Sequence, residues 1–273
     1  MPPPADPHGT RAALVMLAGG DGQRAGHDTN KVLVPLAGRR VFTWSIRWAR
    51  EFPRVTHTVL VVREPDLPTV RQTLEREVEG PEVLVVTGGD SRHGSEWAAL
   101  QVLAGPIEAG EIDVVVIHDA ARPLASSRLF FDVIDAAAQH GGAIPVLEQH
   151  GLTTLAHRNH DDSDEAASVA DGAVVAVQTP QAFLAGPLLR AYRQAAADGF
   201  VGTDTASCIE RYTDLPVRCV TGDARNVKIT FPEDLFVAER LLAKVDYDLS
   251  EHPRESHPRL ASLRRSLRRA ESG

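Results

Sequence analysis

The fold is decided by the stretch Ala12-Ala13-Leu14-Val15-Met16-Leu17, which runs directly into Ala18-Gly19-Gly20-Asp21-Gly22-Gln23-Arg24. The six residues of the apolar run are too few for a helix and end at glycines, so they predict a buried strand that enters a loop. Three glycines within four residues let the backbone turn sharply and bring its N–H groups close to an anion. Arg24 and Lys31 add two positive charges. The stretch therefore predicts either a triphosphate-binding loop or an ordinary glycine-rich turn.

The glycine spacing distinguishes this loop from two common phosphate loops. A P-loop needs its second glycine five residues after the first; counted from Gly20 that position is Ala25, and Gly26, one residue later, is followed by His27 where lysine is required. The dinucleotide fingerprint asks for a third glycine three residues after Gly22, and Ala25 stands there as an accepted variant. What remains, Gly-x-Gly-x-Arg with six residues before the lysine, resembles the signature loop of sugar-phosphate nucleotidyltransferases.

Composition limits the function classes. The 273 residues are enough for one large domain or two small ones, and 43% hydrophobic and 24% charged residues are ordinary for a globular protein. The net charge of −8 argues against nucleic acid as a partner, because nucleic-acid binding needs a basic surface. A phosphate substrate needs only local cations.

The cysteines and the apolar runs bear on the compartment. Cys208 and Cys219 form neither a disulfide framework nor a metal set, and free thiols fit a reducing cytoplasm. The first ten residues lack the apolar region of a signal peptide, and no apolar run approaches the roughly 20 residues of a membrane span. We therefore expect a cytoplasmic protein without a membrane span.

The first half of the chain alternates between strand and helix patterns. After the first strand, the pattern predicts strands at 56–62, 83–87 and 113–117, helices at 41–51, 67–79 and 95–103, and a last helix at 231–245. Strands that are apolar on both faces and alternate with helices indicate an α/β fold, a mostly parallel sheet with helices on both faces. In such sheets ligands bind beyond the carboxyl ends of the strands.

Two later strand ends carry candidate site residues. The loop Gly88-Gly89-Asp90-Ser91-Arg92-His93-Gly94-Ser95 again allows close approach, and we expect Ser95 to cap the next helix, either simply as an N-cap or next to a bound anion. After the fourth strand, Asp119 stands where a Mg²⁺ ligand would lie. For Arg122 we expect a structural pair with a carboxylate, and for His118 a hydrogen-bonding role at the strand end.

Taken together, these motifs resemble those of the 2-C-methyl-D-erythritol 4-phosphate cytidylyltransferase family. The resemblance rests on Ala-Gly-Gly-x-Gly-x-Arg…Lys, then Gly-Gly-Asp-x-Arg-x-x-Ser, then Val-Ile-His-Asp-Ala-Ala-Arg-Pro, and it runs from about residue 11 to 244. Four later stretches agree: Gln178–Phe183, Thr203–Ser207, Asn226–Thr230 and Pro232–Leu235. The resemblance implies a Rossmann-like, mostly parallel sheet and a protruding β-arm at about 147–176 that hooks a second copy into a homodimer. The cytidylyltransferase domain would span 11–246, between a disordered segment at 1–10 and a polar, basic tail at 247–273.

The resemblance also implies roles for individual residues. Backbone and side chains that wrap CTP would be those of Ala18, Gly19, Gly20, Gly22, Gly89, Asp90 and Ser95. The cations that hold the phosphates and stabilise the transition state would be Arg24, Lys31 and Lys228. Acceptor-side positions would be Thr179, Thr203 and Asp204. Asp119 would bind Mg²⁺, and the substrates would be CTP and a phosphorylated polyol.

The predicted arm departs from the family pattern. Where the family carries Asp-Thr-x-Lys, this chain has Gln149-His150-Gly151-Leu152-Thr153-Thr154, and an arginine expected to meet the acceptor phosphate is replaced by Asp171. A carboxylate at that place is unfavourable for a phosphate. Three hypotheses follow: a methylerythritol phosphate enzyme with a rebuilt arm, a cytidylyltransferase for another acceptor such as ribitol 5-phosphate or a phosphonate, and a nucleotide-binding paralogue without turnover.

The last residues carry a separate pattern. Leu260, Leu263 and Leu267 lie at helical spacing among four arginines. The pattern allows an amphipathic basic helix that contacts a membrane or an acidic partner, or a solvated tail.

Overall fold

The structure is a computed structural model. It describes residues 9–20, 30–52, 54–149, 174–202 and 204–251, with the backbone alone for 244–251. Gly22, Arg24, Thr203 and Asp171 therefore lie outside the described residues, as do the C-terminal leucines and arginines. Most of the predicted arm lies outside them as well.

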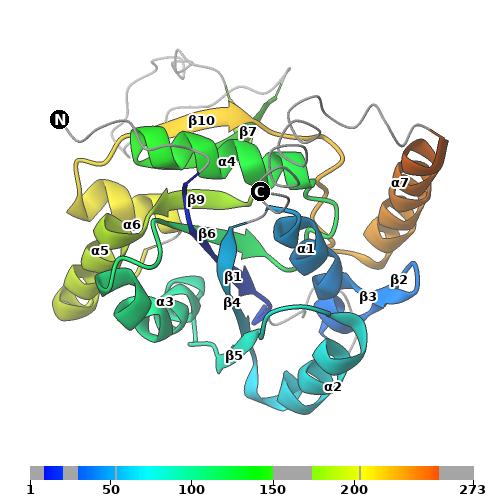
Figure 1. The fold of residues 1–273 in the computed structure, drawn as a ribbon, viewed down its shortest axis with the longest axis horizontal. Coiled ribbons are helices and arrows are strands. Elements are labelled where there is room, and N and C mark those ends of the chain that lie inside the picture. The colour runs from blue at the N-terminus through cyan, green and yellow to red at the C-terminus, as the bar shows by residue number, and fades with distance from the viewer. Residues whose placement is uncertain (1–8, 21–29, 53, 150–173, 203, 252–273) are drawn as a thin grey trace, which may run out of the picture.

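The described residues form an eight-stranded sheet at the centre of the molecule (Figure 1). Its order is β10-β7-β9-β6-β1-β4-β5, and β8 pairs with β7. The strands are β1 (Ala12–Leu17), β4 (Val55–Val62), β5 (Leu84–Thr87), β6 (Val114–Asp119), β7 (Gly142–Glu148), β8 (Val175–Val177), β9 (Gln181–Leu184) and β10 (Val217–Thr221). Strands β6, β1, β4 and β5 are parallel to one another, whereas β9 is antiparallel to both β6 and β7.

Helices cover both faces of the sheet. The apolar side chains of α1 (Val41–Arg50), α2 (Leu67–Glu77), α4 (Ser127–His140) and α7 (Pro232–Glu251) join one core cluster. Those of α3 (Arg92–Glu108), α5 (Ala185–Asp198) and α6 (Thr205–Tyr212) join the other. Strand β1 contributes to both clusters, because its side chains alternate between the two faces of the sheet: Leu14 and Met16 belong to the first cluster, and Ala13 and Val15 to the second. The predicted α/β class with a mostly parallel, doubly covered sheet is thus confirmed.

The elements predicted for the first half are present, with shifted ends. Strand β1 has the predicted bounds, and α1, α2, β4, β5 and β6 end within two residues of the prediction. The last helix is confirmed but continues to Glu251. A short ribbon, β2 (Pro35–Leu36) with β3 (Arg39–Arg40), and the 3-10 turns Lys31–Leu33 and Glu64–Asp66 were not predicted.

The predicted start of α3 is wrong. The helix begins at Arg92, and Ser91 rather than Ser95 caps it, because the extended Ser91 accepts a hydrogen bond from the backbone N–H of Gly94 with its side-chain oxygen. Ser95 already lies inside the first turns. The helix also continues past Gly105 and Pro106 to Glu108, since a proline in the last turn removes only one backbone hydrogen bond.

The described ends of the predicted arm form a ribbon. Strands β7 and β8 pair antiparallel, with Val146 opposite Val177 and Glu148 opposite Val175. All three residues of β8 are exposed. The segment between the two strands, which holds most of the predicted arm, lies outside the described residues.

Gly141, between α4 and β7, gives a test of the packing that sets this part of the sheet. Its φ is +115°, and an added Cβ would lie 2.7 Å from Leu215 Cδ1 and 3.2 Å from the Pro216 carbonyl oxygen. We expect Gly141→Ala to lower the free energy of unfolding by about 3 kcal/mol, from backbone strain and overpacking together. Gly110→Ala is the matched control, because Gly110 also has a positive φ (+71°) but has nothing within 4 Å of the added Cβ.

We expect Gly110→Ala to cost only about 1 kcal/mol. Urea denaturation followed by circular dichroism measures both variants, and equal losses would contradict the packing argument.

Candidate active site

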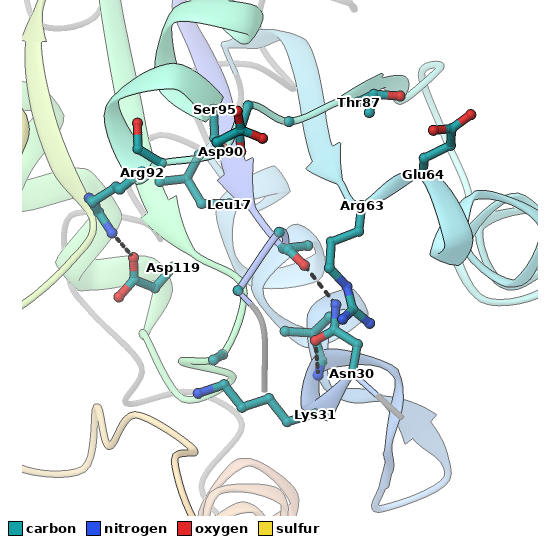
Figure 2. A pocket seen from close by; sticks show the side chains of 18 of the residues that line it. Leu17, Asn30, Lys31, Arg63, Glu64, Thr87, Asp90, Arg92, Ser95 and Asp119 are labelled. Carbon is teal, nitrogen blue, oxygen red and sulfur yellow. Dashed lines mark hydrogen bonds and ion pairs between the residues drawn. The ribbon is translucent and has the colours of Figure 1, made fainter. Parts of the chain in front are cut away.

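A cavity of about 680 Å³ lies at the carboxyl ends of four neighbouring parallel strands. Its walls come from the segments that follow β1, β4, β5 and β6, together with the segment before α1 and Lys228 from the segment before α7. Figure 2 shows Arg92 and Asp119 joined on one side of the cavity, and Asn30 with Lys31 on another. The cavity thus occupies the place at which an α/β sheet is expected to bind a ligand.

Asn30 holds the two ends of the first loop together. Its Nδ2 donates to the Ala18 carbonyl oxygen and to Asp66 Oδ2, both at 2.8 Å, and its Oδ1 accepts from the Val32 N–H at 3.3 Å. Asn30 is 2% exposed, and Asp66 is in turn paired with Arg63 at 2.8 Å. Lys31 follows directly and lines the cavity, so this clamp sets the position at which the lysine enters it.

Of the residues expected to wrap a nucleotide, the structure brings six to this cavity. They are Ala18, Gly19, Gly20, Gly89, Asp90 and Ser95. Gly22 and Arg24 belong to the same stretch and lie outside the described residues.

The glycines of the second loop pack against the start of α3. A Cβ on Gly89 would lie 3.0 Å from the Gly94 carbonyl carbon, and one on Gly88 would lie 2.7 Å from Ser95 Oγ. Ser95 is 7% exposed, and its hydroxyl donates to the Gly89 carbonyl oxygen at 3.4 Å. The sequence suggested that these glycines allow an anion to approach the backbone. In the structure their lack of a side chain also leaves room for the first turn of α3.

Asp119 lies between three cations. Its Oδ1 accepts a hydrogen bond from Arg92, its Oδ2 lies 2.7 Å from Lys228 Nζ, and Arg122 Nε is 3.8 Å from the same oxygen. Burial by itself would raise the pKa of Asp119, but the charges of Arg92 and Lys228 outweigh it and hold that pKa well below its usual value. The carboxylate is therefore ionised at any pH at which the protein would work.

The Asp119 side chain has the charge and the place that a Mg²⁺ ligand needs. Mg²⁺ sites often use one or two carboxylates and complete the coordination with substrate phosphates and water. Among the described residues no group of three or more His, Cys, Asp or Glu side chains could hold a metal alone. Binding of Mg²⁺ by Asp119 therefore stays a prediction.

His118 and Arg122 have the structural roles predicted from the sequence. His118 is fully buried; its Nδ1 lies 3.1 Å from Thr179 Oγ1, and its Nε2 lies 3.2 Å from both Ser45 Oγ and the Arg122 carbonyl oxygen. The Thr179 hydroxyl accepts from the Asp119 N–H at 3.0 Å, so its hydrogen is available to His118 Nδ1. Arg122 donates to the Asn226 carbonyl oxygen at 2.8 Å.

The described acceptor-side candidates do not line the cavity. Thr179 lies behind Asp119, with its hydroxyl engaged as above. Asp204 is the N-cap of α6, and its Oδ1 accepts from the Ser207 N–H at 2.8 Å. Their contact with an acceptor remains a prediction.

Lys228 reaches the cavity because its segment is fixed by neighbours. The buried Asn226 donates to the Thr179 carbonyl oxygen at 2.8 Å, and the Ile229 N–H donates to the Ala121 carbonyl oxygen at 2.8 Å. The first bond ties the segment to the residues between β8 and β9, and the second ties it to the residues that follow β6.

Two residues of this site were not given a role from the sequence. Arg92 was part of a quoted motif, and its pairing with Asp119 depends on the contact between α3 and β6. Asn30 could have been found, because asparagine directly before a short helical turn is a common N-cap.

Comparison with known proteins decides the family. The family model described as 2-C-methyl-D-erythritol 4-phosphate cytidylyltransferase matches residues 12–244. This chain belongs to that family.

Individual relatives of the cytidylyltransferase family agree over most of their length. The protein of that name from Symbiobacterium thermophilum is 37% identical over 237 residues, which cover 84% of this chain and 92% of the relative. The one from Geobacillus kaustophilus is 33% identical, with 84% and 96% covered.

Solved structures show the same fold. A 4-diphosphocytidyl-2C-methyl-D-erythritol synthase from Anaerococcus prevotii has a TM-score of 0.70 at 24% identity, covering 86% of this chain and 97% of its own. The cytidylyltransferase from Thermus thermophilus has a TM-score of 0.59 at 26% identity, with 85% and 98% covered. None of the described helices is long and apolar enough to cross a membrane.

His118 predicts an acid sensitivity of this cytidylyltransferase. Burial lowers the pKa of His118 from 6.5 to about 4, so between these values the unfolded chain binds a proton that the folded chain does not. This contribution therefore destabilises the fold as the pH falls below 6.5, by about 2 kcal/mol at pH 5.

The variant His118→Gln lacks this contribution. We expect the difference in unfolding free energy between wild type and variant to shrink by about 2 kcal/mol from pH 7 to pH 5, as urea denaturation at the two pH values measures. An unchanged difference would show that His118 takes up its proton in the folded state as readily as in the unfolded one.

Proposed function

We propose that this chain transfers the cytidylyl group of CTP to the phosphate of 2-C-methyl-D-erythritol 4-phosphate and releases pyrophosphate. The observation that carries the proposal is the convergence of Lys31, Arg92 and Lys228 with Asp119 around one cavity bounded by two glycine-rich loops. Membership of the family supports the nucleotide and the acceptor.

The reaction needs charge stabilisation more than proton transfer. A phosphate monoester is largely dianionic at pH 7, so an acceptor oxygen can attack the α-phosphorus of CTP without a general base. A new P–O bond forms, the bond from the α-phosphorus to the bridging oxygen breaks, and pyrophosphate leaves with the electron pair. The barrier is mostly repulsion between anions and the charge that builds on the leaving group.

The side chains of the cavity address that barrier directly. Lys31 and Lys228 would hold the phosphates, and the Asp119 carboxylate, kept ionised by its neighbours, would hold Mg²⁺. When bound, Mg²⁺ would neutralise charge on the phosphates. Asn30 would keep Lys31 at the cavity through its bonds to Ala18 and Asp66.

We also propose a cytoplasmic homodimer joined through the arm. The support is the antiparallel ribbon of β7 and β8, which exposes Val175 (39%) and Val177 (45%) where a partner would pack. Sedimentation of the full chain and of a variant shortened between 149 and 174 would test this proposal. We expect a dimer for the full chain and a monomer for the shortened one.

The acceptor is tested by pyrophosphate release from Mg²⁺-CTP. We expect release with 2-C-methyl-D-erythritol 4-phosphate and little with ribitol 5-phosphate. The second acceptor is included because Asp171 replaces an arginine of the family pattern. Release with ribitol 5-phosphate alone would overturn the acceptor assignment. If CTP binds but neither acceptor gives pyrophosphate release, the proposal that the protein is an active transferase would be wrong.

Lys31 gives the sharpest test of the catalytic role. We expect Lys31→Ala to lower kcat by about 10²-fold or more, as for the loss of one transition-state donor. The control is Arg128→Ala, which removes an exposed cation paired with Asp132 on α4, outside the cavity. Turnover of Lys31→Ala close to that of Arg128→Ala would exclude the role.

A further inference from the structure

Glu96 is a buried carboxylate that the reaction as described does not use. It lies on α3 and is 0% exposed. Its Oε1 accepts from the Thr205 hydroxyl at 2.8 Å, its Oε2 accepts from the Tyr192 hydroxyl, and Arg92 Nε lies 2.9 Å from Oε1. Partners from three helices, α3, α5 and α6, thus meet at one carboxylate.

A buried charge of this kind is a poor way to gain stability. Removing a carboxylate from water costs several kcal/mol, and an apolar side chain of similar size often serves a core as well or better. Burial raises the pKa of Glu96, while the charge of Arg92 and the hydroxyls of Tyr192 and Thr205 act against that rise. Both oxygens face donors, which suits a carboxylate acceptor. The arrangement therefore fixes the position of its partners more than it stabilises the fold.

Arg92 is the partner that reaches the cavity. Its guanidinium lies between two carboxylates: Nε beside Glu96 and Nη1 bonded to Asp119 Oδ1. The contact with Glu96 is an ion pair, since the geometry of Nε does not make a hydrogen bond. An arginine side chain has a long, flexible stem, so two anchors are needed to hold its planar head in one orientation. Glu96 supplies the anchor on the side away from the cavity.

The other partners tie this anchor to the rest of the α3 face. Tyr192 is fully buried and its ring stacks on that of His93, with centroids 4.6 Å apart, which directs its hydroxyl to Glu96. Thr205 is the first residue of α6 and follows Asp204, which the family resemblance assigns to the acceptor side. Helices α3, α5 and α6 lie together beside the sheet in Figure 1.

We infer that Glu96 is a positioning residue of this cytidylyltransferase: it fixes Arg92 against Asp119 and joins it to the N-terminus of α6. The inference rests on the proposed function, because Arg92 is taken to act on the bound nucleotide. Glu96 itself touches no substrate.

Glu96→Gln tests the inference, because it removes the charge and keeps the shape. We expect kcat to fall about tenfold or more, since small displacements of an orienting group are costly in a preorganised site. The matched control is Glu108→Gln, also on α3 and paired with Arg193 of α5, but exposed and outside the cavity. It should keep the wild-type kcat.

A double-mutant cycle separates positioning from a structural role. If Glu96 acts through Arg92, then Arg92→Lys with Glu96→Gln should have the kcat of Arg92→Lys alone, whereas independent roles would multiply the two losses. A wild-type kcat for Glu96→Gln, or losses that multiply, would overturn the inference. If Glu96→Gln does not fold, as thermal denaturation will show, Tyr192→Phe replaces it in the cycle, with the same two outcomes.

Measuring the Kd of CTP allows the inference about Glu96 to be tested even if the proposed function fails. If the wild type releases no pyrophosphate, the proposed function fails, and the same cycle is read from the Kd of Mg²⁺-CTP by calorimetry. We then expect Glu96→Gln, but not Glu108→Gln, to weaken CTP binding about threefold to tenfold. Equal affinity in the two variants would overturn the inference by itself.

Discussion

The ion pairs of Asp119 connect the parts of the chain that form the cavity. The carboxylate stands at the end of β6, Arg92 begins α3, and Lys228 precedes α7, so three distant segments meet at two oxygen atoms. Without the Asp119 carboxylate, Arg92 and Lys228 would repel each other. The shared carboxylate allows both cations to remain close, and the cations can give up part of their contact with it when they bind the phosphates of a ligand. Asp119 thus serves as the counter-ion of Arg92 and Lys228.

Local pattern was sufficient to predict the first half of the fold and the edge of the sheet at which the cavity lies. The apolar run before the glycines, and the alternation after it, indicated the parallel strands and placed the site at their carboxyl ends. The antiparallel β9 between β6 and β7 could not be read in this way, because strand order depends on pairing between residues far apart in sequence. The wrong cap of α3 has a local cause, since two serines four residues apart offered the same chemistry and the approach of Gly94 decided between them.

The cavity and the arm carry different kinds of information about function. The cavity residues are held by bonds that the structure describes, whereas the expected departures from the family pattern, Gln149 to Thr154 and Asp171, fall in the predicted arm. Side-chain roles that depend on long-range contact, such as those of Arg92 and Glu96, became visible only once the helices were placed. A sequence pattern indicates which residues could take part in the reaction, and tertiary packing determines which of them are held in position.

The bonds of Asn30 have a consequence for the placement of Lys31. Because its Nδ2 joins the Ala18 carbonyl oxygen to Asp66, both ends of the first loop are tied to β1 and to the segment after β4. One neutral side chain therefore braces the entry of the lysine against the first strand. The spacing between β1 and Lys31 is set by an amide that carries no charge and takes no part in the chemistry.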